Sequence, residues 1–193
     1  MGKILKKDIL KLKPTQFAIG FEEVDDKVNK LLKMTSKQRK KHQETKVIPG
    51  VFAPDGNFYI IDHHHAARAC WEIGLKKVNV YAVADYRNLS SMTKFWEHME
   101  TRGWVYPFSQ FGKQQLPYEL LPQDVRGLAD DPYRGLAWAV KEASGFPKSE
   151  VPFFEFAWAN YFRAKIPART VRQNFDLAVR QAVKLCKTKK GSI

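Results

Sequence analysis

Cysteine is scarce in this chain, and its scarcity argues against two classes of small protein. The two cysteines, Cys70 and Cys186, lie far apart and form no Cys-x-x-Cys pair. A disulfide-stapled scaffold and a cysteine-based zinc site both need closely spaced cysteines, so the sequence favours neither. Apolar runs of membrane-spanning length and a signal-peptide core are also lacking. The sequence therefore predicts a cytoplasmic protein with no membrane segment.

Acidic residues are few relative to basic ones. The 193 residues include 33 Lys and Arg against 20 Asp and Glu, which gives a net charge of +13 and a pI near 9.7. Much of the excess falls between residues 30 and 46 and between residues 163 and 190. Such clusters suit a polyanion, so the predicted partner is a nucleotide or a nucleic acid. The alternative is that the excess lysine serves only solubility.

The order of hydrophobic patterns predicts an α+β protein. Short strands are expected at residues 9–12, 47–53, 58–61 and 78–84, with an Asp-Gly turn joining the middle two. Helices are expected at residues 21–34, 37–44, 62–73, 89–102, 131–144, 152–164 and 170–187. Residues 1–87 should therefore form a short-stranded α/β domain, and residues 88–193 a helical C-terminal extension packed on it.

The expected helix at residues 37–44 is almost entirely polar and includes Lys37, Arg39, Lys40 and Lys41. Because it has no apolar face, it can contribute little to a core. A solvated surface helix is the first interpretation. A helix that lies along a phosphate backbone, or above a pocket, is the second.

Ionisable side chains are concentrated where the strand at 58–61 gives way to a helix. Asp62, His63, His64 and His65 are consecutive, and Arg68 follows one turn later. The first turn of a helix has unpaired backbone N–H groups and a partial positive charge, so it binds phosphate well. Imidazoles titrate near a pH of about 6.5 and can donate or accept a proton at neutral pH. This junction is therefore the predicted site.

The chemistry of these side chains suggests their roles. Asp62, His64 and His65 are the predicted catalytic residues, although Asp62 would also suit a helix cap with no chemical role. His63 and Arg68 are predicted to bind phosphate, the arginine through paired hydrogen bonds. Successive helical residues point about 100° apart, so three adjacent imidazoles cannot all face one ligand. One of them should be buried and structural.

Two further features bear on this site. Asp62 with one or two histidines suits a divalent metal such as Mg²⁺, Mn²⁺ or Zn²⁺, and Mg²⁺ or Mn²⁺ can also arrive with a nucleotide. In the segment Asp130-Asp131-Pro132-Tyr133-Arg134, Asp131 and Pro132 suit the start of a helix, and Arg134 is the third predicted phosphate-binding residue. Trp104 and other aromatic residues could stack on bases, although most aromatics at helical spacing belong to a core.

These elements together resemble the ParB/sulfiredoxin fold, in which a loop at a helix N-terminus binds phosphate. The resemblance spans roughly residues 4–86 and is carried by three stretches: Val47-Ile48-Pro49-Gly50-Val51, the Asp-Gly hairpin, and the run from Tyr59 to Ala69 leading into a helix that Gly74 ends. Three later stretches are similar to the putative ParB-like nuclease family and extend the resemblance to about residue 162. They are Trp104-Val105-Tyr106-Pro107, Asp130-Asp131-Pro132-Tyr133-Arg134 and Pro152-Phe153-Phe154-Glu155-Phe156.

The chain departs from better-known branches of that fold. ParB partition proteins carry a nucleotide-binding Gly-Glu-Arg-Arg loop where this chain has Asp62-His63-His64-His65. Sulfiredoxins need a cysteine in the loop, whereas Cys70 falls inside the helix. Free serine kinases have a closer loop, of the Asp-Gly-His-His-Arg type, but use a glutamate near the position of Gln16. Because glutamine cannot act as a base, the resemblance to the kinases is weaker.

The resemblance implies a nuclease, or another hydrolase acting on phosphate esters, that binds nucleotide or nucleic acid at the loop from Asp62 to His65. Two alternatives stay open at this point. One is a nucleotide-dependent kinase of a small molecule with the same fold. The other is a non-catalytic module that binds nucleotide or DNA.

Overall fold

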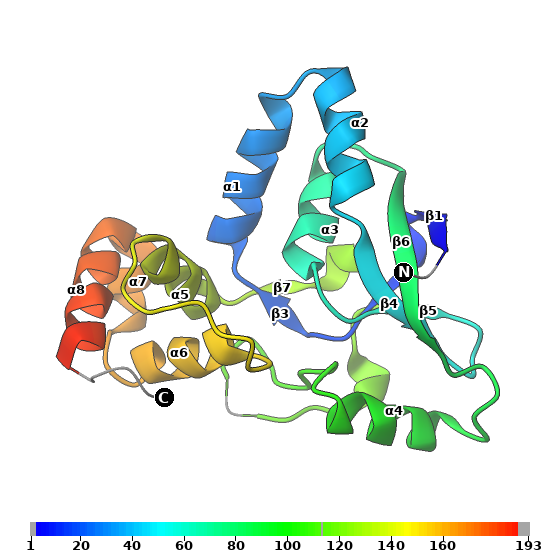
Figure 1. Cartoon of the computed structure of the whole chain (residues 1–193). Coiled ribbons are helices and arrows are strands. Elements are labelled where there is room, and N and C mark those ends of the chain that lie inside the picture. The colour runs from blue at the N-terminus through cyan, green and yellow to red at the C-terminus, as the bar shows by residue number, and fades with distance from the viewer. Residues whose placement is uncertain (1–2, 113, 189–193) are drawn as a thin grey trace.

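A mixed sheet and a set of helices form the part of the chain that the computed structural model describes, residues 3–112 and 114–188, and the predicted α+β class is confirmed (Figure 1). The sheet has the strand order β1-β6-β4-β5-β2. β6 pairs antiparallel with β1 and parallel with β4, while β5 pairs antiparallel with β4 and parallel with β2. Its strands are β1 (Ile4–Asp8), β2 (Leu12–Pro14), β4 (Ile48–Phe52), β5 (Phe58–Ile60) and β6 (Lys77–Asp85).

Helices cover both faces of this sheet. Alternate residues of β5 point to opposite sides, as the pleat of a strand requires. Phe58 and Ile60 belong to the core that includes residues of α1 (Phe21–Leu32) and α3 (His64–Glu72). Tyr59 points the other way, and its ring centroid lies 5.2 Å from those of Phe95 and Trp96 on α4 (Met92–Thr101). A strand with both faces buried is apolar throughout, as β5 is.

The polar helix expected near residues 37–44 is present as α2 (Ser36–Thr45), and none of its residues is buried. Thr35 and Gln38 form a capping box at its start, which supplies the local stability that an apolar face would otherwise give. In Figure 1, α1 and α2 stand together at one end of the molecule.

The C-terminal helices are α5 (Pro132–Glu142), α6 (Phe154–Arg163), α7 (Ala168–Gln173) and α8 (Phe175–Thr188), and they share a core of their own. The prediction of one helix over residues 170–187 was wrong, because the chain breaks at Asn174. The Asn174 side chain accepts a hydrogen bond from the Leu177 N–H at 3.1 Å and so caps the start of α8. Of the predicted basic tail, Lys189 and Lys190 lie outside the described residues.

The prediction of a strand at residues 9–12 was also wrong in its position. The first strand is residues 4–8, and residues 9–11 form a 3₁₀ turn, η1 (Ile9–Lys11), before β2 begins. The Asp8 carboxylate accepts the Leu10 N–H at 3.0 Å, and this local bond competes with strand pairing at that point. Two more short 3₁₀ turns, η2 (Tyr118–Leu120) and η3 (Val125–Gly127), lie between α4 and α5.

A small parallel pair of strands joins the two parts of the fold. β3 (Ala18–Ile19) pairs with β7 (Ala129–Asp130), and the Asp130 carboxylate accepts the N–H of Phe21 at the start of α1. Gly20 then brings the backbone of α1 against α5, because a Cβ at Gly20 would lie only 2.3 Å from the Gly135 nitrogen. The sequence did not predict this pairing, and it sets the position of α5 relative to the sheet.

No helix among residues 3–112 and 114–188 is long and apolar enough to cross a membrane.

Candidate functional site

The start of α3 lies where the sequence places it and has an unusual backbone. His63 is the N-cap residue and has a left-handed conformation, with φ 63°, which residues other than glycine and asparagine rarely adopt. The Asp62 carboxylate accepts the adjacent His63 N–H at 2.6 Å and does not cap the helix. Within the described residues no side chain caps α3. Its first N–H groups are therefore available to an acceptor from outside the helix.

His64 and His65 are both buried, and each accepts a backbone N–H. His64 Nε2 accepts from Thr15 at 3.1 Å, and His65 Nε2 accepts from Gly20, also at 3.1 Å. Burial lowers the pKa of His64 to about 4. Burial, and then the nearby Arg134 charge, holds the pKa of His65 well below its usual value. Both rings are thus neutral at pH 7 and hold the segment from Thr15 to Gly20 against α3.

His63 lines a cavity of about 250 Å³ among α1, α2, α3 and β6, referred to below as the basic cavity. Its Nδ1 atom is buried and has no hydrogen-bond partner within the described residues. Three lysines and one aspartate contribute the charge, and His42 adds a second imidazole. The lining residues include Asp26, Lys27, Lys30, His42, Lys46 and Ala66. Leu31, Ile48 and Val78 are among the apolar residues that also line the cavity.

The lysines of the basic cavity differ in their partners. The Lys27 Nζ lies 3.3 Å from Glu23 Oε1, and the Lys30 Nζ lies 2.6 Å from Asp26 Oδ2. In each pair the two residues are one helical turn apart on α1. Lys46 forms no ion pair within the described residues. Burial, followed by the charges of Lys46 and Lys27, lowers the pKa of His42. The field in this cavity is therefore positive, which suits an anion.

Arg68 does not line the basic cavity, and its side chain contacts other parts of the protein. Its Nε pairs with Glu72 at 2.7 Å, and its guanidinium packs on the rings of Phe21 and Trp71. Its Nη1 donates to the carbonyl groups of residues 125, 126 and 128 at 3.2 to 3.4 Å. These contacts fasten η3 to α3.

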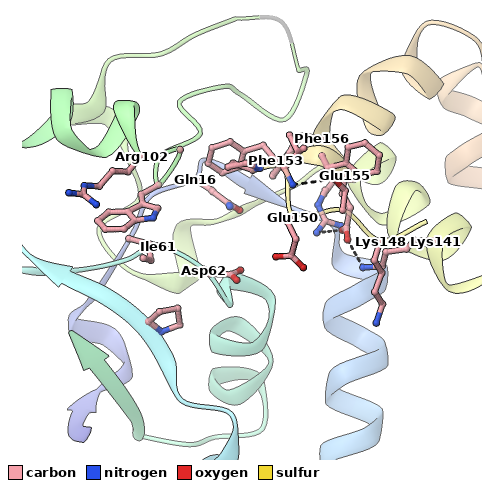
Figure 2. Close-up of a pocket in the computed structure, with 18 of the residues that line it drawn as sticks. Gln16, Ile61, Asp62, Arg102, Lys141, Lys148, Glu150, Phe153, Glu155 and Phe156 are labelled. Atoms are coloured by element: carbon pink, nitrogen blue, oxygen red, sulfur yellow. Dashed lines mark hydrogen bonds and ion pairs between the residues drawn. The ribbon is translucent and has the colours of Figure 1, made fainter. Parts of the chain in front are cut away.

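A second and larger cavity, of about 750 Å³, separates the sheet from α5 and α6 and is referred to below as the interface cavity (Figure 2). Asp62 lines it, so the loop before α3 has one cavity on the Asp62 side and the other on the His63 side. Gln16, Trp104 and Arg134 also line it, together with the segment from residue 147 to residue 156. Figure 2 shows the Gln16 amide and the Asp62 and Glu150 carboxylates directed into it.

Arg134 is buried in a network of charges at one wall of the interface cavity. It pairs with Glu23 of α1 at 3.2 Å and with Glu155 of α6, and Glu155 also pairs with Lys141. Glu23 lies 3.4 Å from His65 Nε2 as well. This network links α1, α5 and α6. The neighbouring Asp131 caps α5, as predicted, by accepting the Tyr133 N–H, and it pairs with Arg163.

The residues predicted as one site are therefore distributed among different surroundings. Asp62 and Arg134 line the interface cavity, His63 lines the basic cavity, and His64, His65 and Arg68 make internal contacts. No group of three His, Cys, Asp or Glu in residues 3–112 and 114–188 is placed to hold a metal ion. Asp62 alone could contribute a carboxylate to a cation that another ligand brings.

Sequence reasoning missed Lys27, Lys30 and Lys46 as neighbours of His63. Lys27 and Lys30 are three residues apart on α1, a spacing that places both on one helical face. The sequence shows that spacing, but it does not show that this face of α1 packs next to α3, because the packing depends on residues far apart in the chain.

The fold and the site define a class: an α+β protein in which an uncapped helix start, with lysines in the adjacent cavity, follows an interior strand of the sheet. Comparison with known families is more specific. The chain matches the family described as "Putative ParB-like nuclease" over residues 5–164, and it belongs to that family. It is also similar to protein Atu1540 from Agrobacterium tumefaciens, whose crystal structure matches with a TM-score of 0.88 and 32% identity, over 97% of this chain and 92% of that one. No curated protein matches the chain.

Proposed function

We propose that this protein binds the phosphate of a nucleotide or nucleic-acid strand in the basic cavity, at the start of α3, and acts on a phosphate ester there. One observation carries the proposal. His63 has a left-handed backbone at the uncapped start of α3 and lines a cavity bordered by lysines, and its Nδ1 is buried without a hydrogen-bond partner among the described residues. Unpaired N–H groups, an imidazole and ammonium groups together form a binding set for phosphate.

The chemistry of the pocket assigns different roles to its residues. The N–H groups of the first turn of α3 and the side chains of His63 and Lys46 would contact phosphate oxygens. Asp62 precedes His63 in the chain and lines the interface cavity, on the other side of the loop; it is exposed, forms no ion pair among the described residues, and is the candidate general base. Mg²⁺ or Mn²⁺ arriving with a nucleotide would find one protein carboxylate there. The description of the family as nucleases supports the hydrolytic part of the proposal.

The kinase alternative has less support. Glu22 and Glu23 are the carboxylates that follow Gln16 most closely in the chain, and one of them would have to replace the missing glutamate. Both lie in the first turn of α1, where Glu23 is buried and paired with Arg134, and neither lines the interface cavity. A non-catalytic binding module is the second candidate, because no group of three His, Cys, Asp or Glu among the described residues is placed to hold a catalytic metal ion.

Calorimetry with pyrophosphate and ATP tests the phosphate site. His63→Asn keeps a residue that tolerates the left-handed backbone and removes the imidazole. We expect this variant and Lys46→Gln each to weaken binding about tenfold, the effect of losing one charge-assisted hydrogen bond. Lys76→Gln, an exposed lysine that lines neither cavity, is the matched control and should bind normally. Unchanged affinity in His63→Asn would remove the basis of the proposal.

Turnover is tested separately with single-stranded DNA and ATP in the presence of Mg²⁺ or Mn²⁺. If Asp62 is the general base, Asp62→Asn should lower the rate by about 100-fold or more while binding persists. Tight phosphate binding without turnover in the wild-type protein would instead identify the non-catalytic module.

A further inference from the structure

The interface cavity has a composition that the phosphate site does not explain. Its volume of about 750 Å³ falls within the range of pockets that enclose whole small molecules. Its walls come from both parts of the fold: Gln16, Ile61 and Asp62 on one side, and the segment from residue 147 to residue 156 on the other (Figure 2). A ligand there would contact residues on each side of the β3–β7 junction.

Gln16 is the first indication of what that ligand offers. Its side chain is only 8% exposed, and its Oε1 has no hydrogen-bond partner within the described residues. The backbone around it is held firmly, because Thr15 is bonded to His64 and Gln16 forms a bridge with Tyr106. A buried acceptor left unpaired is costly, so this amide is a fixed acceptor that lacks a donor. Figure 2 shows it directed into the cavity.

The charged residues that line the cavity also indicate a ligand with hydrogen-bond donors. Arg134 and Lys141 are occupied by Glu23 and Glu155, so the inner cations are already neutralised. Asp62 and Glu150 form no ion pair within the described residues and add two further acceptors. Such a wall suits a ligand group that carries N–H donors better than it suits a phosphate.

The remaining walls suit a flat molecule. Trp104 is partly exposed in the cavity, with the Arg102 guanidinium 5.0 Å above its ring, and Phe153 and Phe156 also line the space. Aromatic and guanidinium planes stack on nucleobases regardless of their sequence. Arg102 and Lys148 are exposed and form no ion pair in the described part of the chain, so they add two cations to a lining that also has the exposed Asp62 and Glu150.

We infer that the interface cavity is a nucleobase site, in which Gln16 accepts a hydrogen bond from an exocyclic amine and Trp104 stacks on the ring. Adenine, cytosine and guanine carry that amine. The exposed Arg102 and Lys148 would lie near the phosphate of the same nucleotide. This inference does not rest on the phosphate site at α3, since Gln16 and Trp104 line the interface cavity and not the basic cavity.

The test compares two nucleosides that differ in one group, adenosine and purine riboside, which lacks the 6-amino group. Calorimetry should show adenosine binding to the wild-type protein at least tenfold more tightly than purine riboside, the effect of one satisfied buried acceptor. Gln16→Leu removes the acceptor at similar size. This variant should bind adenosine about tenfold or more weakly and bind purine riboside with unchanged affinity. Its free energy of unfolding in urea should be equal to or greater than that of the wild type.

Trp104→Ala provides an independent variant and should weaken both nucleosides about tenfold through lost stacking. Gln16→Leu should leave pyrophosphate binding intact, and His63→Asn should leave adenosine binding intact, so failure at one site is distinguishable from failure at the other. Absence of binding by adenosine, cytidine and guanosine at millimolar concentration would overturn the inference. Equal adenosine affinity in the wild-type protein and Gln16→Leu would overturn it as well.

Discussion

Three consecutive histidines have three different surroundings in this protein. His63 lines the basic cavity, His64 accepts the Thr15 N–H, and His65 accepts the Gly20 N–H. The helical rotation of about 100° per residue predicts that they diverge. It does not predict that two of the three would be buried, since that depends on where residues 15–20 run. His63 has the left-handed backbone, and it is the one that we propose contacts phosphate.

The buried His64 makes stability depend on pH. Its folded pKa of about 4 lies below the value of about 6.5 in the unfolded chain, so the unfolded state takes up the proton first as the pH falls. Stability is full above pH 6.5 and declines between pH 6.5 and 4, by roughly 3 kcal/mol from this residue. Urea titrations across this range should show a smaller decline in His64→Gln than in wild type. His98→Gln, at an exposed position, should keep the wild-type decline.

Arg68 was predicted to bind phosphate, and in this structure it makes internal contacts. We expect Arg68→Ala to lower the free energy of unfolding by about 2 kcal/mol or more, because three carbonyl groups lose their donor. Pyrophosphate affinity of the folded protein should change little. The matched control is Arg126→Ala, since Arg126 pairs with Asp124 at the exposed surface of the same region and should have no measurable effect on urea unfolding. A tenfold loss of pyrophosphate affinity in Arg68→Ala would return this residue to the site.

At the scale of elements, Gly20 determines how closely α1 approaches α5. An added Cβ would lie 2.3 Å from the backbone nitrogen of Gly135, which cannot move without displacing the helix. Gly20→Ala should therefore cost about 2 kcal/mol or more in urea unfolding. Gly135→Ala is the informative control, because its Cβ would meet the flexible Glu22 side chain at 3.3 Å and alanine favours the helix. Equal effects of the two substitutions would show that the close approach is not the cause.

α2 has no buried residue, and the capping box of Thr35 and Gln38 stabilises its start. Lys37, Lys40 and Lys41 are all exposed on it, next to the basic cavity that His42 lines. If single-stranded nucleic acid follows this helix, replacing all three by glutamine should reduce the slope of log affinity against log salt by about 2. Fluorescence anisotropy at several salt concentrations measures that slope. The control replaces the exposed Lys94, Lys165 and Lys184 by glutamine. It has the same net charge as the α2 variant and should keep the wild-type slope.

The sequence predicted elements better than it predicted their junctions. The helices with strong apolar periodicity, α1 and α5 among them, lie where their patterns place them, and so does the strand-to-helix turn at Asp62. The two-residue strands β3 and β7 have no pattern of their own, and their pairing joins positions more than a hundred residues apart. The interface cavity depends on that pairing. Gln16 could therefore be seen only as a missing base, and not as an unpaired acceptor.

At the scale of the whole molecule, the expected boundary near residue 87 is crossed by many contacts. The core that contains α1 and α3 includes Val125 and Leu128, and the core under α4 includes Phe17, Val51 and Tyr59. Glu23 pairs with Arg134, and the Tyr106 N–H donates to the Thr15 carbonyl. These contacts make the first part of the chain dependent on the second for burial of its apolar surface.

A fragment of residues 1–87 should therefore not fold by itself. Without residues 88–193 it would expose the face of β5 that carries Tyr59 and would lose the hydrogen-bond partners of β3. Since small domains have little stability to spare, losing one face of the sheet should leave the fragment without a cooperative urea transition. Proton NMR should show poor amide dispersion for the fragment, whereas the whole chain should unfold in one transition by both fluorescence and circular dichroism. A dispersed spectrum from the fragment would mean that the sheet and α3 are a domain in their own right. The proposed phosphate site at α3 would then form without residues 88–193, and only the interface cavity would require them.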